Sequence, residues 1–175
     1  SSNAISPLAL FTLRSLGAGT LFWLISLFMP KEAVERRDLP KIFAASVLGF
    51  FEEICNIPHI SYHEKALSDY CVRFAKERNL EQYQDKLGNV IIIKEATAGY
   101  EQAPPVLVQG HMDMVAVKEP DCSINMEKEG LSLLVEGDYV SAKGTSLGGD
   151  DGIAIAYALA VLDSDEIPHP RLEVV

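Results

Sequence analysis

The stretch Val106-Leu107-Val108-Gln109-Gly110-His111-Met112-Asp113 joins a short apolar segment to a histidine and an aspartate. The apolar residues predict a short buried strand, so His111 lies where a strand gives way to a loop. In open α/β sheets, ligands bind at the carboxyl ends of the strands. His111 and Asp113 are two residues apart and therefore face the same side of an extended chain. This spacing suits a zinc-binding imidazole that a nearby carboxylate orients.

A second motif follows at Gly148-Gly149-Asp150-Asp151-Gly152. The glycines predict a flexible turn, and the small apolar residues from Gly152 to Leu162 predict a buried helix. Aspartate is favoured at helix N-termini, so capping alone explains the two aspartates. The preceding glycines, however, let the backbone approach a ligand closely. The pair therefore also fits a functional site at the start of this helix.

Each motif alone has a structural explanation. His111 fits a hydrogen-bonded histidine at the end of a strand, and Asp150 with Asp151 fits a helix cap. Taken together, their order and their apolar flanks favour a metal-assisted hydrolase.

With these motifs the chain resembles the aminoacyl-histidine (Xaa-His) dipeptidases, which are co-catalytic zinc peptidases and deacylases. The resemblance corresponds to the amino-terminal portion of such an enzyme. It implies an α/β fold in which a mixed β-sheet is flanked by helices. The stretches that carry it are Phe50–His59, Ser61–Glu64, Asp85–Val90, Gln109–Val115, Ala142–Gly148 and Leu172–Val175.

The resemblance implies a role for each matching position. His111 would ligate one Zn²⁺, Asp150 would bridge two Zn²⁺, and Asp113 would be the catalytic carboxylate that supports His111. It also implies a cis peptide bond between Asp150 and Asp151. The expected reaction is the zinc-dependent hydrolysis of small Xaa-His dipeptides in the cytoplasm. A related zinc deacylase or tripeptidase is the alternative within the family.

The resemblance also implies that parts of the centre are absent from this sequence. The family's general base is in a Glu-Glu pair just beyond the strand at 171–175, and further zinc ligands and a lid domain follow. Catalytic zinc usually has about three protein ligands. We therefore expect an incomplete catalytic domain that is inactive alone and binds zinc weakly or not at all.

Composition restricts the partners. The net charge of −10 excludes nucleic acid as an expected partner, because such proteins carry basic patches. The three cysteines have no metal-binding spacing and are expected to be reduced, with Cys55 and Cys71 in the core. A small peptide is the expected ligand, and a homo-oligomer is left open.

The amino-terminal residues differ from the rest. Residues 1–4 have the composition of a cloning scar, and 5–41 form an apolar segment of uncertain origin before the peptidase-like part at 42–175. The apolar stretch 7–29 is of borderline length for a membrane span, which is not the favoured interpretation but stays open. A different class of function follows from it: a fusion or truncated chain without catalysis that binds a membrane or a protein through this segment.

The remaining pattern predicts the elements around the two motifs. Ser61 and Glu64 fit a capping box, which places His63 in an exposed first turn. His59 and His169 are expected in loops without a role in the site. Helices are predicted over 42–56, from Ser61 to about 78, and up to Asp163; strands are predicted at 81–86, 90–94, 106–110 and 171–175, with a hairpin over 131–142.

Overall fold

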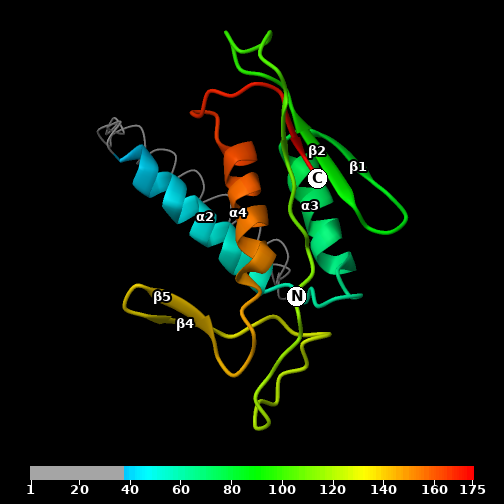
Figure 1. Ribbon diagram of the computed structural model, residues 1–175, viewed down its shortest axis with the longest axis vertical. Helices are drawn as coiled ribbons and strands as arrows, with labels where there is room; N and C mark the ends of the chain where they lie inside the picture. Colours follow the sequence, from blue (N-terminus) through cyan, green and yellow to red (C-terminus); the bar gives the residue numbers. More distant parts are fainter. Residues whose placement is uncertain (1–37) are drawn as a thin grey trace, which may run out of the picture. The chain divides into compact units, whose positions relative to one another are not determined.

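The computed structural model describes residues 38–175 (Figure 1). The expectations for the apolar segment 7–29 therefore lie outside the described residues. Within residues 38–175, no helix combines the length and the apolar character needed to cross a membrane. The elements are α2 (Leu39–Cys55), α3 (Lys65–Glu77), β1 (Glu81–Gln84), β2 (Val90–Lys94), β3 (Val106–Val108), β4 (Leu133–Glu136), β5 (Tyr139–Ala142), α4 (Gly149–Asp163) and β6 (Leu172–Val174).

The central sheet has four strands in the order β1-β2-β6-β3. β3 runs parallel to β6, whereas β1, β2 and β6 pair antiparallel. A parallel neighbour needs a long crossover, and the chain between β3 and β6 provides it with the β4–β5 hairpin and α4. The α/β fold with a mixed sheet, as predicted, is confirmed.

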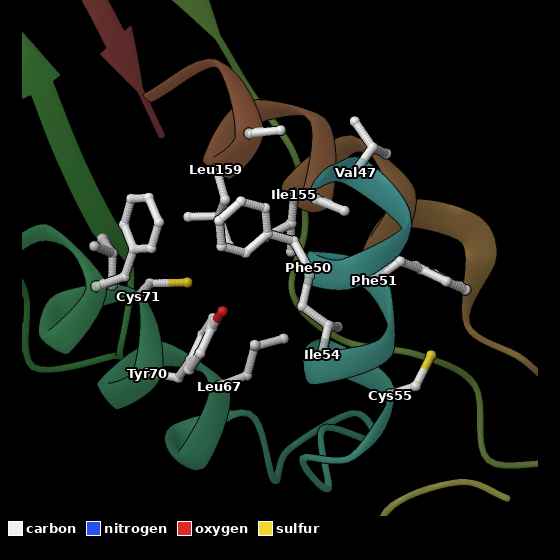
Figure 2. Close-up of a cluster of buried hydrophobic side chains, with 14 of the residues drawn as sticks. Val47, Phe50, Phe51, Ile54, Cys55, Leu67, Tyr70, Cys71, Ile155 and Leu159 are labelled. Carbon is white, nitrogen blue, oxygen red and sulfur yellow. The ribbon is translucent and has the colours of Figure 1, made fainter. Parts of the chain in front are cut away.

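Helix α3 packs against β1 and β2 on one face of this sheet, and α2 and α4 share the same hydrophobic core. That face carries Val90, Ile92 and Leu172, all of which are buried. Figure 2 shows where the helices meet, with side chains of α2, α3 and α4 facing one another across the core. Burial raises the pKa of the Cys55 thiol to about 11 and that of Cys71 to about 12, so both are inert core residues, as predicted.

The prediction of a buried strand at 106–110 is wrong. β3 spans only Val106–Val108, and its first two side chains are 45% and 62% exposed. The reason is its place in the sheet: among the described strands, β3 is an edge strand that pairs with β6 alone. An apolar run therefore identified the strand but not its burial, because edge and central strands share the same composition.

The predicted capping box is also wrong. α3 begins at Lys65, and its N-cap residue, Glu64, makes no side-chain cap hydrogen bond. Between them lies a turn in which Tyr62 has a φ of 72° and donates its backbone N–H to Glu64 Oε1 at 2.5 Å. The Ser61 side chain therefore does not cap α3, and its hydroxyl donates to Asp113 instead.

Lys94 links the sheet to the end of α4. Its ammonium donates hydrogen bonds to the carbonyl oxygens of Leu162 (2.9 Å) and Ser164 (2.7 Å), and its side chain is 14% exposed. A cation at a helix C-terminus satisfies carbonyls that have no partner within the helix. We expect Lys94→Met to lower the free energy of unfolding by about 1–3 kcal/mol in urea titrations, because the two carbonyls lose their charged donor.

A matched control is Lys65→Met, which removes an exposed lysine paired with Asp69 one helical turn away. An exposed pair of this kind contributes little to stability. Equal effects of the two substitutions would contradict the capping role of Lys94.

Candidate metal centre

His111 lies in the loop that follows β3, and this loop is held at both ends. The N–H of Gly110 donates to the Val175 carbonyl at 3.1 Å, which extends the β3–β6 pairing by one step. Beyond His111, Met114 forms a parallel bridge with Ile60. The loop therefore presents His111 at the carboxyl end of strand β3, and ligands bind at the carboxyl ends of strands in open α/β folds.

The structure brings His111 and Asp150 together, although 39 residues separate them in the chain. His111 Nε2 lies 3.2 Å from Asp150 Oδ1. The His111 side chain is 49% exposed and that of Asp150 is 97% exposed, so a ligand can reach both. The two sequence motifs thus meet with their polar atoms facing each other.

Asp113 contacts the opposite side of the His111 ring. The Nδ1 atom lies 3.0 Å from the Asp113 backbone oxygen and 3.2 Å from its Oδ1. The other carboxylate oxygen, Oδ2, accepts a hydrogen bond from the Ser61 hydroxyl at 2.5 Å. A chain of contacts therefore runs from Ser61 through Asp113 and His111 to Asp150.

The start of α4 is irregular at the two aspartates. Asp150 and Asp151 have non-helical backbone angles, no side-chain cap is formed at Gly148, and the peptide bond between the aspartates is cis, as the resemblance implied. Asp151 Oδ2 lies 3.2 Å from the point that a Cβ on Gly110 would occupy. The two aspartates therefore lie in a kink and not at the N-cap position, which Gly148 occupies, so side-chain capping of a regular first turn does not explain the pair.

These contacts shift two pKa values. Desolvation lowers the pKa of His111, but the hydrogen bonds to Asp150 and Asp113 and their charges raise it, and the net pKa is above the ordinary value. The hydrogen bond from Ser61 lowers the pKa of Asp113, burial opposes this, and the nearby His111 lowers it further. Asp113 is thus held as an acceptor.

The donor pair fits one edge of a zinc site. Two ligands at about 2.0 Å from a tetrahedral zinc ion lie about 3.3 Å apart, close to the observed His111–Asp150 separation. Imidazole nitrogen and carboxylate oxygen are both common zinc ligands. Within the described part of the chain, however, no cluster of three histidine, cysteine or acidic side chains could hold an ion. The residues fit a partial coordination sphere.

Gly148 and His59 lie close together beside the site; the sequence placed Gly148 in the turn before the aspartates but gave His59 no part in the site. Gly148 has a φ of 71°, and a Cβ there would lie 2.9 Å from Met114 Sδ and 3.4 Å from His59 Nε2. His59 is only 3% exposed, and its Nδ1 lies 2.6 Å from the Ile57 carbonyl oxygen. The glycine before the aspartates was a usable signal, whereas nothing local marked His59 as a buried neighbour of the site.

Burial of His59 makes the stability of the fold depend on pH. Desolvation lowers the pKa of His59 below its ordinary value of 6.5, although the Ile57 hydrogen bond and the Asp113 charge oppose the shift. Below about pH 6.5 the unfolded chain therefore takes up a proton that the folded chain resists, and the stability conferred by neutral His59 is lost as the pH falls toward the folded-state pKa.

We expect urea titrations to show this as a difference between the native chain and His59→Asn, which retains a side-chain N–H donor but cannot titrate. The stability gap between them should narrow from about pH 7.5 to about pH 5.5. A gap that stays constant over this range would show that His59 does not titrate in the way described.

Comparison with known proteins gives relatives for most of the chain. It is 41% identical over 138 residues to the cytosol non-specific dipeptidase of Escherichia coli, which covers 79% of this chain and 28% of that protein. The crystal structure of aminoacylhistidine dipeptidase from Vibrio alginolyticus matches with a TM-score of 0.72 and 44% identity, over 74% of this chain and 26% of that chain. No family model matches the chain.

A tripeptidase from Staphylococcus aureus has the same fold at 22% identity and a TM-score of 0.56, over 74% of this chain and 35% of that chain. The chain spans about a quarter of the length of the two dipeptidases that it matches. These comparisons confirm the resemblance to the aminoacyl-histidine dipeptidases that the sequence motifs indicated.

Proposed function

We propose that this chain, similar to two dipeptidases at more than 40% identity, supplies part of the active site of a cytoplasmic zinc dipeptidase. The observation that carries the proposal is the approach of His111 Nε2 to Asp150 Oδ1 across the molecule. The substrate class is a small dipeptide, with histidine as its second residue, by analogy with the Vibrio alginolyticus enzyme.

Three side chains have distinct roles in this proposal. His111 and Asp150 would hold Zn²⁺, and Asp113 would orient His111. Bound zinc would polarise the scissile carbonyl and lower the pKa of its water to about 7. With the proton of neutral His111 on Nδ1, its N–H would donate to the Asp113 backbone oxygen at 3.0 Å beside the carboxylate oxygen Oδ1 at 3.2 Å, and Nε2 would be available to a cation next to Asp150.

The described residues do not provide the whole centre. They contain no third ligand near His111 and Asp150. We therefore propose that this chain alone binds zinc weakly and does not turn over peptides, and that the remaining ligands and the general base come from outside residues 38–175. A deacylase or tripeptidase is less well supported, because the tripeptidase match is at 22% identity and shows the fold alone.

A chimera tests the proposal directly. The matched part of this chain would replace its counterpart in the Escherichia coli dipeptidase, to which it is 41% identical. We expect the chimera to hydrolyse alanyl-histidine, to lose this activity on treatment with a chelator, and to regain it when Zn²⁺ is added. The chain alone should be inactive under the same conditions.

The unmodified Escherichia coli protein serves as the control for the assay. A chimera that folds, as judged by circular dichroism, but remains inactive with Zn²⁺ would overturn the proposal. Activity that survives complete metal removal would overturn the metal-dependent mechanism.

A further inference from the structure

Ser61 lies next to the candidate site and makes a side-chain hydrogen bond that helix capping does not explain. Its hydroxyl donates to Asp113 Oδ2 at 2.5 Å, across 52 residues of chain. It does not cap α3, which begins four residues later without a side-chain cap. Its other contact, with the Met114 carbonyl oxygen, is much longer at 3.4 Å. The hydroxyl is therefore directed at the Asp113 carboxylate.

The backbone around Ser61 is already fixed without this hydroxyl. Ser61 donates its N–H to the Met114 carbonyl, and Met114 donates its N–H to the His59 carbonyl, both at 3.1 Å. These two bonds form the parallel bridge between the segment 59–61 and the loop that carries His111. The two segments are thus held together without the Ser61 hydroxyl. The hydrogen bond from this hydroxyl instead restrains the Asp113 carboxylate.

The two oxygens of Asp113 have different partners. Oδ2 accepts from Ser61, whereas Oδ1 faces His111 Nδ1 at 3.2 Å. The terminal torsion of an aspartate is broad, so a carboxylate with one partner can rotate away from it. With both oxygens engaged, this rotation is suppressed, and Oδ1 stays 3.2 Å from Nδ1, where it adds to the Asp113 backbone oxygen that lies 3.0 Å from the same nitrogen.

We propose that Ser61 is a positioning residue that fixes the Asp113 carboxylate and thereby keeps the proton of neutral His111 on Nδ1. This positioning role depends on the proposed function, because a free lone pair on Nε2 matters only if His111 binds a cation. Without the hydroxyl, the proton moves toward Nε2, which carries it in the favoured neutral tautomer of a histidine side chain in water. Nε2 then donates to Asp150 and has no lone pair for a metal.

Nitrogen NMR of the full chain, labelled with ¹⁵N-histidine, tests this without metal or substrate. Long-range ¹H–¹⁵N spectra at about pH 9, where imidazole is neutral, distinguish a protonated ring nitrogen from one with a lone pair. His111 is assigned by the signal that disappears in His111→Ala. In the native chain we expect the Nδ1-protonated form of His111 to predominate.

Two substitutions at Ser61 and one matched control complete the design. Ser61→Ala should lower the ratio of Nδ1-protonated to Nε2-protonated His111 by about threefold or more, since one hydrogen bond is lost. Ser61→Thr retains the hydroxyl and should restore the native ratio. Ser68→Ala is the control, because Ser68 is fully buried and donates to the Gly88 carbonyl at 2.6 Å without touching the site.

A native tautomer ratio in Ser61→Ala, or the same change in Ser68→Ala, would overturn the positioning role. In the chimeric dipeptidase, Ser61→Ala should lower kcat about tenfold with little change in KM, and Ser61→Thr should recover it. A chimera that is inactive while the tautomer still responds to Ser61 would refute the proposed function and leave the positioning role intact. An active chimera in which the His111 tautomer does not respond to Ser61→Ala would support the proposed function and refute the positioning role.

Discussion

Replacing His111 by alanine should lower kcat/KM for alanyl-histidine by about a thousandfold or more in the chimeric dipeptidase. The substitution removes the imidazole whose Nε2 lies 3.2 Å from Asp150 Oδ1. Losing a direct zinc ligand costs more than losing an outer-shell partner, for which effects of about 10–100-fold are typical. The measurement is steady-state hydrolysis at saturating Zn²⁺, together with the zinc content of the purified protein.

His63→Ala is the matched control. His63 is exposed in the turn before α3, and no contact joins its side chain to the site. We expect its kcat/KM to stay within about twofold of the parent chimera, as for a surface substitution away from functional groups. Retained turnover and retained zinc in His111→Ala would show that this histidine is not a ligand.

The substitution Gly130→Ala is expected to destabilise the fold by about 3 kcal/mol or more, because overpacking against backbone cannot relax by a change of rotamer. A Cβ at Gly130 would lie 2.4 Å from the Asn56 carbonyl oxygen and 2.6 Å from its Cα. The neighbouring Leu131 N–H donates to the Cys55 carbonyl at 2.7 Å, so the two segments cannot separate without losing this bond. Urea unfolding followed by circular dichroism measures the change.

Gly49→Ala is expected to change the free energy of unfolding in the opposite direction. Gly49 lies within α2, and a Cβ there meets nothing within 4 Å. Alanine in a helix is favoured over glycine by about 1 kcal/mol, so this variant should be more stable than the native chain. If Gly130→Ala unfolded at the same urea concentration as Gly49→Ala, the close approach at Asn56 would be refuted.

Local sequence was sufficient for most elements. The helix up to Asp163 ends where predicted, and the hairpin turns at Gly137, which has a φ of 61°. These features depend on short-range signals: hydrophobic spacing, and glycine where the backbone must be left-handed. The approach of His111 to Asp150 was instead expected from the family resemblance, because 39 residues separate the two side chains and no local signal connects them.

The remaining features depend on partners far along the chain. Ser61 has the sequence context of a helix cap, and only the folded molecule shows that its hydroxyl donates to Asp113 instead of to the helix. Lys94 ends an apolar strand like any surface lysine, yet it binds the end of α4, 68 residues away. The exposure of β3 is set by which strands lie beside it, a property of the sheet order and not of its own three residues.

The attachment of Lys94 has a consequence for the opposite end of the molecule. A regular helix from Gly152 to Asp163 is about 18 Å long and resists compression, so it behaves as a rigid rod. Lys94 fixes one end of this rod to strand β2, and Asp150 lies just beyond the other end. The contact of Lys94 at the far end of α4 therefore helps to fix the position of the Asp150 carboxylate along the helix axis. If α4 moved along its axis, Asp150 would move with it relative to His111.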